Sequence, residues 1–233
     1  MRALGCIWND LNDKNFDILV KRTKNRLIAA EKVSNYEIII FSIINLVFGV
    51  IPLFFISKFS IILCFCVLPL IISYPFMKRI TWWPQLWLGL NFNWGLLVGY
   101  YSVSDIKLNI TIILFYTGSI FWTIAYDTIY GFQDIEDDIK IGVKSTSIKF
   151  RKSPKIFLIF NYFICYVFWI TSLSTLMPHT LILFFLSAMF ITLVFNILKM
   201  SLADPLSCER SFKNNSLFGF FTTILLVSFN IFK

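Results

Sequence analysis

Two short stretches of this chain hold most of its carboxylates. Eight of the 13 acidic residues lie between residues 9 and 17 or between residues 127 and 138. The remainder is mostly apolar, and 58% of all residues are hydrophobic. Carboxylates at the edge of a bilayer are costly unless they are paired or bound to a metal, so both stretches are functional candidates. Two such clusters in one chain suggest a shared divalent-cation site.

A helical projection gathers the side chains of each stretch on one face. At 100° per residue, the first stretch has an arc of about 60°, occupied by Asp10, Asp13 and Asp17 with Asn9 at its edge. The second stretch has an arc of about 80°, occupied by Asp127, Tyr130, Asp134 and Asp138. Mg²⁺ prefers one or two carboxylates together with phosphate oxygens and water. The two faces are therefore predicted to hold Mg²⁺ that bridges a diphosphate.

A simpler interpretation is that the acidic residues belong to solvated helix ends and loops, where they often alternate with lysines. The presence of two clusters in a chain so poor in acids argues against it. Only Glu136, which projects from the opposite face of the second stretch, is interpreted in this way.

Basic residues near the two stretches fit an anionic partner. The first stretch is followed by Lys21, Arg22, Lys24 and Arg26, and the second by Lys140 and Lys144. Tyr74 and Lys78 lie four residues apart, where a hydroxyl and an ammonium group can both donate to phosphate oxygens. Taken alone, this spacing equally fits an interfacial aromatic residue beside a base that extends toward the membrane surface.

Seven apolar segments must position these residues. They run over residues 36–56, 59–77, 84–103, 108–131, 156–176, 179–198 and 215–232. Each is close to the roughly 20 residues that a spanning helix needs. The predicted fold is all-α: a polytopic transmembrane helix bundle with about seven full spans, forming a single domain over residues 1–233.

The basic residues that give the chain its formal charge of +8 are distributed unevenly among the connections between apolar segments. Seventeen of the 21 basic residues fall in alternate connections, whereas the intervening connections hold only Lys58 and Lys107. This pattern is typical of cytoplasmic or matrix-facing loops, and it predicts that both acidic stretches lie on that side. It accounts for the positive charge without a nucleic-acid partner.

The first eight residues are apolar but too few to span a bilayer. They are predicted to be the end of a partial helix, either because the start codon lies upstream or because the protein is truncated.

Three motifs carry a resemblance to a known family. They are Asn9-Asp10-x-x-Asp13-x-x-x-Asp17 with Lys21-Arg22-Thr23-x-Asn25-Arg26, then Tyr74-Pro-Phe-Met-Lys78-Arg79, then Asp127-x-x-Tyr130-x-x-x-Asp134-x-x-x-Asp138. In this order they resemble the UbiA-type intramembrane prenyltransferases, over residues 1 to about 230. Two further stretches resemble the 4-hydroxybenzoate polyprenyltransferase branch, namely Pro84-Gln85-x-x-Leu88-Gly89 and Lys140-Ile-Gly-Val-Lys144-Ser145-Thr146. The stretch Ile80-Thr-Trp-Trp-Pro-Gln is similar to alphaproteobacterial and mitochondrial members.

The resemblance implies a fold and a reaction. Members have nine transmembrane helices around a central cavity, capped by two acidic cytoplasmic loops, and this chain would lack helix 1 and the start of helix 2. The reaction would be Mg²⁺-dependent transfer of a polyprenyl group from a polyprenyl diphosphate to the ring of 4-hydroxybenzoate, in ubiquinone biosynthesis. The location would be a bacterial cell inner membrane or the mitochondrial inner membrane, within the lipid bilayer.

The resemblance also implies residue roles. The Mg²⁺ ligands would be Asn9, Asp10, Asp13, Asp17, Asp134 and Asp138. Catalytic roles would fall to Asp10, Asp13, Asp134, Asp138 and Lys78. Substrate binding would involve Arg22, Arg26, Tyr74, Lys78, Arg79, Asp127, Tyr130 and Lys144. The chain departs from the family at Arg26-Leu27 and Ala30, where members have Arg-Pro and a glycine, so its loop direction is less restricted there.

Three alternatives to this function stay open. One is another UbiA-type transferase, of the haem O, menaquinone or chlorophyll type. A second is a cation transporter with an acidic vestibule, although transporters more often place ionisable groups at the membrane midplane, and the central thirds of these apolar segments are nearly free of charge. A third is an inactive, truncated remnant.

Overall fold

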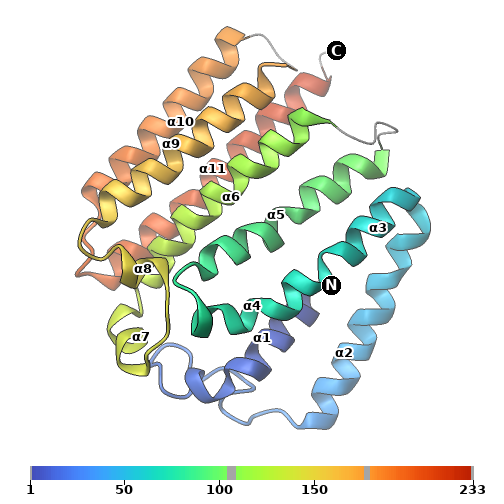
Figure 1. Cartoon of the computed structure of the whole chain (residues 1–233), viewed down its shortest axis with the longest axis vertical. Coiled ribbons are helices and arrows are strands. Elements are labelled where there is room, and N and C mark those ends of the chain that lie inside the picture. Colours follow the sequence, from blue (N-terminus) through green and yellow to red (C-terminus); the bar gives the residue numbers. More distant parts are fainter. Residues whose placement is uncertain (1, 104–108, 176–178, 232–233) are drawn as a thin grey trace. The chain divides into compact units, whose positions relative to one another are not determined.

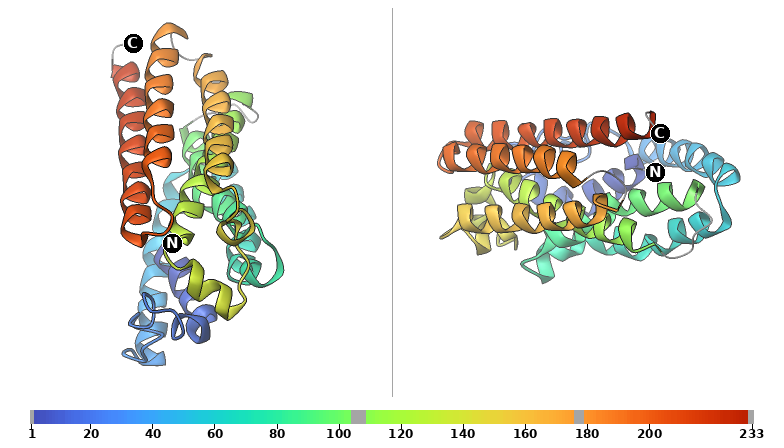
Figure 2. Two further views of the ribbon diagram at one scale, coloured as in Figure 1. Left: turned by 90° about the vertical axis from the view of Figure 1, so that its left-hand side faces the viewer. Right: turned by 90° about the horizontal axis from the view of Figure 1, so that it is seen from above.

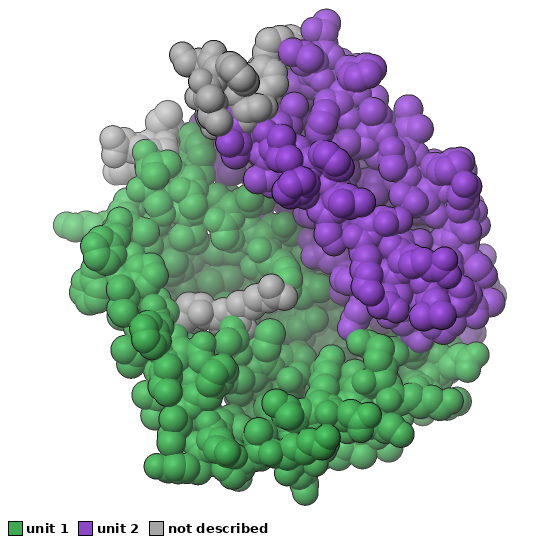
Figure 3. All heavy atoms as spheres, turned by 180° about the vertical axis from the view of Figure 1, so that it is seen from behind, with its two compact units in different colours: residues 1–107, 134–144 green, residues 108–133, 145–233 purple. Residues whose placement is uncertain are grey.

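The computed structural model describes residues 2–103, 109–175 and 179–231, and all regular structure in these ranges is helical (Figure 1). The predicted all-α fold is therefore confirmed. Lys107, which the charge pattern uses, lies outside the described residues. The chain divides into two compact units, residues 1–107 with 134–144 and residues 108–133 with 145–233, coloured separately in Figure 3.

The first unit contains seven helices in its described part. They are α1 (Arg2–Asp17), α2 (Asn35–Val50), η1 (Ile51–Phe55), α3 (Lys58–Cys66), α4 (Leu68–Ile80), α5 (Pro84–Val103) and α7 (Ile135–Ile141). Helix α4 packs against both α1 and α5, and α3 packs against α5. Helix α2 starts at a capping box, in which Ser34 and Glu37 each accept the other's backbone N–H.

The second unit is a helical bundle. Its described helices are α6 (Ile110–Gly131), α8 (Thr146–Lys149), α9 (Pro154–Leu173), α10 (His179–Lys199) and α11 (Pro205–Ile231). Helices α9, α10 and α11 run alongside one another (Figures 1 and 2), and α6 packs against α9 and α11.

Aromatic side chains fill the interior of this bundle. Trp169 stacks on Phe218 with a centroid distance of 5.3 Å, and Trp122 packs against both rings. Buried Asn215 accepts hydrogen bonds from Trp122 Nε1 at 3.1 Å and from the Tyr162 hydroxyl at 2.7 Å. This pairing satisfies polar groups that would be costly to leave unpaired in an apolar interior.

Five helical segments are long and apolar enough to cross a membrane. They are Asn35–Phe55, Lys58–Ile80, Ile110–Gly131, Pro154–Leu173 and Thr180–Lys199. Helices α5 and α11, which occupy the other two predicted apolar runs, are not among them. The chain is thus a multi-pass helical membrane protein, while the number of seven spans stays a prediction.

Candidate functional site

The first acidic stretch lies on α1, as predicted. Asp13 and Asp17 are buried, with relative exposures of 4% and 7%. Asn9 donates from its amide to Asp13 Oδ2 at 3.1 Å, across one helical turn. The helix therefore presents its carboxylates on successive turns.

Helix α4 brings Lys78 and Arg79 onto α1. Lys78 Nζ lies 2.6 Å from an Asp13 carboxylate oxygen. Arg79 donates to the backbone carbonyl of Asn12 at 2.8 Å, and its guanidinium lies 4.8 Å from the ring centre of Phe16. Consecutive bases of α4 thus bind consecutive residues of α1, so Arg79 ties the two helices together.

Pro75 interrupts the hydrogen bonding of α4 ahead of these bases. A proline inside a helix lacks an N–H and its ring displaces the carbonyl four residues earlier. Neighbouring side chains donate to carbonyls in this turn: Trp8 Nε1 to Ile72 at 3.1 Å, and Asn91 Nδ2 to Leu70 at 3.2 Å. Side chains of α1 and α5 therefore bind the turn of α4 that precedes Pro75.

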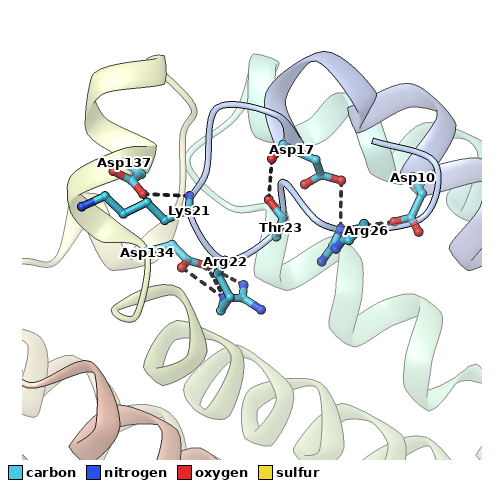
Figure 4. Close-up of polar contacts among 8 residues, drawn as sticks. All are labelled: Asp10, Asp17, Lys21, Arg22, Thr23, Arg26, Asp134 and Asp137. Atoms are coloured by element: carbon cyan, nitrogen blue, oxygen red, sulfur yellow. Dashed lines mark hydrogen bonds and ion pairs between the residues drawn. The ribbon is translucent and has the colours of Figure 1, made fainter. Parts of the chain in front are cut away.

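The loop after α1 returns a base to the first acidic stretch (Figure 4). Arg26 Nη1 lies 3.2 Å from Asp10 Oδ1 and 3.0 Å from Asp17 Oδ2, so one guanidinium bridges two carboxylates. Thr23, which is buried, donates from its hydroxyl to the Asp17 backbone carbonyl at 2.9 Å. The loop is therefore folded back on the end of the helix.

The same loop also binds the second acidic stretch (Figure 4). Arg22 Nε donates to both carboxylate oxygens of Asp134, at 3.1 and 2.9 Å, and Arg22 Nη2 pairs with the same carboxylate. The backbone N–H of Lys21 donates to Asp137 Oδ2 at 3.3 Å. A basic loop therefore connects the two acidic stretches within the first unit.

The prediction that the second stretch forms one helical face is wrong. Helix α6 ends at Gly131 and α7 begins at Ile135, so Asp127 and Tyr130 lie on a different helix from Asp134 and Asp138. The 100° periodicity cannot be carried across this break. Asp127 and Tyr130 belong to the second unit, whereas Asp134 and Asp138 belong to the first.

Local interactions explain the break. The N–H groups of Phe132 and Gln133 bond to carbonyls three residues back, which tightens and ends α6. A Cβ on Gly131 would lie 2.4 Å from the Ser147 hydroxyl oxygen. Asp134 then takes the N-cap position of α7, a place that aspartate favours. Its side chain makes no capping bond, because it is engaged by Arg22.

The remaining predicted substrate residues lie on several elements. Lys144 is fixed to the end of α4, because its backbone N–H donates to the Lys78 carbonyl at 2.7 Å and its Nζ donates to the Ile80 carbonyl at 3.1 Å. Tyr130 packs against Phe212 in the second unit, with a centroid distance of 4.9 Å. Tyr74 lies on α4 one turn before Lys78 and is half-buried.

Burial makes three carboxylates of the site weaker acids. Desolvation raises the pKa of Asp10 and of Asp13. The pKa of Asp138 is raised to about 6, first by desolvation and then by the like charge of Asp134. Asp13 Oδ1 is buried and has no hydrogen-bond partner. A buried, unpartnered carboxylate oxygen is suited to a hard cation.

The donor set of the predicted metal site thus fits Mg²⁺ in chemistry. In the part of the chain that the structure describes, however, no three histidine, cysteine or acidic side chains are grouped to hold a metal ion. The carboxylates instead face Arg22, Arg26 and Lys78. The metal ligands therefore stay a prediction.

Two residues that bind the loop had no role in the sequence prediction. Asp137 lies within the second acidic stretch and Thr23 within the first motif. Their partners are backbone groups, the Lys21 N–H for Asp137 and the Asp17 carbonyl for Thr23, and side-chain spacing does not reveal such contacts.

The helical membrane fold and the acidic, basic site define a class of intramembrane proteins, and comparison places the chain within it. The sequence profile of the UbiA prenyltransferase family matches residues 1–225, so the chain belongs to that family.

Curated relatives place the chain near one branch. It is 38% identical to "4-hydroxybenzoate polyprenyltransferase, mitochondrial" of Dictyostelium discoideum, over 98% of this chain and 50% of that protein. It is 43% identical to the protein of that name in Drosophila pseudoobscura pseudoobscura, over 68% of this chain and 40% of the relative. It is 34% identical to "4-hydroxybenzoate geranyltransferase 1" of Lithospermum erythrorhizon, over 97% of this chain and 74% of the relative. The chain spans about half the length of the first of these relatives.

Solved structures support the fold. The apo structure of a UbiA homolog from Aeropyrum pernix K1 matches with a TM-score of 0.66 and 19% identity, over 92% of this chain and 85% of that one. A structure from work on digeranylgeranylglyceryl phosphate synthase in membranes matches with a TM-score of 0.61 and 20% identity, over 98% and 80% of the two chains.

Proposed function

We propose that this chain transfers a polyprenyl group from a polyprenyl diphosphate to the ring of 4-hydroxybenzoate, in a Mg²⁺-dependent step of ubiquinone biosynthesis. The names of its relatives support the two substrates. The observation that carries the proposal is the pairing of buried Asp13 and half-buried Asp134 with Lys78 and Arg22, the bases that would bind a diphosphate. Five apolar spans support a site within a membrane, which we propose is a bacterial or mitochondrial inner membrane.

The oxygen donors of Asn9, Asp10, Asp13, Asp17, Asp134 and Asp138 would hold Mg²⁺. When bound, Mg²⁺ neutralises the diphosphate and makes it a better leaving group. The bases of the chain then have two alternative partners. In the described structure Lys78 pairs with Asp13 and Arg22 with Asp134. A bound diphosphate would draw both bases to its phosphate oxygens, and the two carboxylates would then be free to serve as metal ligands.

The two bases would contribute differently to binding. The planar guanidinium of Arg22 already makes a two-point contact with a carboxylate, and the same geometry matches two phosphate oxygens. Lys78 supplies a point charge from the end of α4. Lys144 and the hydroxyl of Tyr74 complete the set of donors from unit 1.

Transfer itself exchanges one bond for another. The allylic C1–O bond breaks and its electron pair leaves with the diphosphate. The ring carbon ortho to the phenol of 4-hydroxybenzoate bonds to C1, and that carbon then loses its proton. Excluding water protects the electron-poor allylic carbon from hydrolysis. Asp127, at the end of α6, is our candidate to accept the ring proton.

An assay in membranes tests the proposal. Radiolabelled 4-hydroxybenzoate and a polyprenyl diphosphate are supplied with and without Mg²⁺, to the chain and to its Asp134→Ala variant. We expect prenylated product only with Mg²⁺, and none from the variant. Glu136→Ala, which removes an exposed carboxylate from the same helix, is the matched control and should stay active. Absence of product from wild-type protein that is present in the membrane contradicts the proposal, as does equal product without Mg²⁺.

A further inference from the structure

Asp137 contacts the basic loop at its backbone. Its Oδ2 accepts the Lys21 N–H at 3.3 Å, and its side chain is 20% exposed. Lys140 Nζ, one turn along α7, lies 3.7 Å from the other oxygen. Figure 4 shows Asp137 and Asp134 projecting from α7 toward the same loop.

The contact lies next to Arg22. Asp134 and Asp137 are three residues apart, so they share a face of the helix start. One receives the Arg22 guanidinium and the other the backbone N–H of the preceding residue. Thr23, the residue after Arg22, is held by its own hydroxyl, which donates to the Asp17 carbonyl. Three consecutive loop residues are thus held, two of them by α7.

Holding the backbone beside an arginine lowers the cost of using that arginine. An arginine on an unanchored loop binds a ligand only after the loop backbone is ordered, and this ordering costs binding free energy. We propose that Asp137 is a positioning residue, which anchors the loop at Lys21 so that Arg22 is placed for the diphosphate. This inference rests on the proposed function, because it assumes that Arg22 binds a diphosphate.

The first experiment measures the loop and the ligand without catalysis. Hydrogen exchange of residues 18–26 is compared in wild-type protein, Asp137→Ala, Asp137→Asn and Glu136→Ala, in detergent. The dissociation constant for geranyl diphosphate with Mg²⁺ is measured for each by calorimetry. We expect faster loop exchange and about fivefold weaker binding in Asp137→Ala, which corresponds to about 1 kcal/mol.

The other variants separate the hydrogen bond from the charge. The carboxamide oxygen of Asp137→Asn can accept the same N–H, so this variant should bind within about twofold of wild type. Glu136→Ala should match wild type. Unchanged exchange and affinity in Asp137→Ala overturn the inference. If Asp137→Asn is instead as weak as Asp137→Ala, the charge is responsible and the inference is also overturned.

A double-variant cycle tests whether Asp137 acts through Arg22. Arg22→Lys keeps the charge but loses the two-point contact. In that background we expect Asp137→Ala to weaken binding by less than twofold. A full fivefold loss would show independent action and overturn the positioning role. In turnover, Asp137→Ala should raise KM for the diphosphate and leave kcat nearly unchanged.

The two proposals fail in different ways. If wild-type protein binds geranyl diphosphate but prenylates no 4-hydroxybenzoate, the proposed function fails and the binding cycle still decides the role of Asp137. If wild-type protein is active and the Asp137→Ala variant binds and exchanges like wild type, only the positioning role fails.

Discussion

Among the described residues, Lys78 forms the shortest ion pair with a buried carboxylate. It lies 2.6 Å from Asp13, and its charge opposes the burial that raises the pKa of that carboxyl. Lys78→Met removes that opposition, so the pKa of Asp13 rises further and the diphosphate loses a donor. We expect activity to fall by about 100-fold or more, as for loss of a preorganised electrostatic contact.

Lys140→Met is the matched control for this change. Lys140 is exposed and pairs only distantly with Asp137, at 3.7 Å. Initial rates at saturating substrate compare the two variants. Equal activity of Lys78→Met and wild type would remove Lys78 from the site.

Protons and metal should compete at Asp138. Its pKa is raised to about 6 by desolvation and by Asp134. A carboxyl binds a cation only after losing its proton, so affinity for Mg²⁺ should fall as the pH falls through about 6 and level off above about 7. The measurement is the Mg²⁺ concentration for half-maximal activity between pH 5.5 and 8.

The Asp138→Asn variant tests the assignment of this titration. It should require more Mg²⁺ at every pH and show a flatter pH dependence. A dependence as steep as that of wild type would mean that another group, such as Asp10 or Asp13, is responsible.

At the scale of elements, α7 depends on its glycine. Gly142 has φ +81°, and its N–H bonds to the carbonyls of Asp138 and Ile139. A Cβ in this left-handed conformation costs about 1–2 kcal/mol. Gly142→Ala should therefore lower the melting temperature in detergent and weaken Mg²⁺ binding, because Asp138 lies one turn before the cap.

Gly95→Ala is the control for this substitution. Gly95 lies inside α5, and a Cβ there would meet nothing within 4 Å. Helical alanine is favoured over glycine by about 0.5–1 kcal/mol, so this variant should be as stable as wild type or slightly more stable. Equal melting temperatures for Gly142→Ala and Gly95→Ala would contradict the role of the cap.

At the scale of the whole molecule, the chain depends on a bilayer. None of the residues of α2, which the structure describes completely, is buried within the chain. Ile44 lies near the middle of this span and is 47% exposed. Ile44→Asp should disfavour insertion of residues 35–55 by about 3–4 kcal/mol, because the unfavourable term of Asp replaces the favourable term of Ile.

A glycosylation reporter of membrane insertion measures this effect on the isolated span. A second comparison uses the intact chain, in which Ile44→Asp should lower insertion of this span, whereas Leu27→Asp, at an exposed loop position outside the spans, should leave it unchanged. Equal insertion of the wild-type and Ile44→Asp spans would contradict a transmembrane position for α2.

Much of the fold and part of the site could be predicted from local sequence. Long apolar runs and spacings of three and four residues predict the helices, and α1 carries Asp10, Asp13 and Asp17 as expected. The prediction of one helical face through Asp127 and Asp138 was wrong, because periodicity does not detect that α6 ends at Gly131, where the next two N–H groups bond to carbonyls three residues back.

The sequence by itself determined the class of protein, the helices and the list of charged candidates, because hydrophobicity and helical period are local properties. Only the tertiary structure decided which charges meet. Arg22 lies 112 residues from Asp134, and the Lys21 N–H lies 116 residues from Asp137. Such partners are chosen by how helices and loops pack, and a buried carboxylate requires a cation or hydrogen-bond donor wherever that packing brings one within reach.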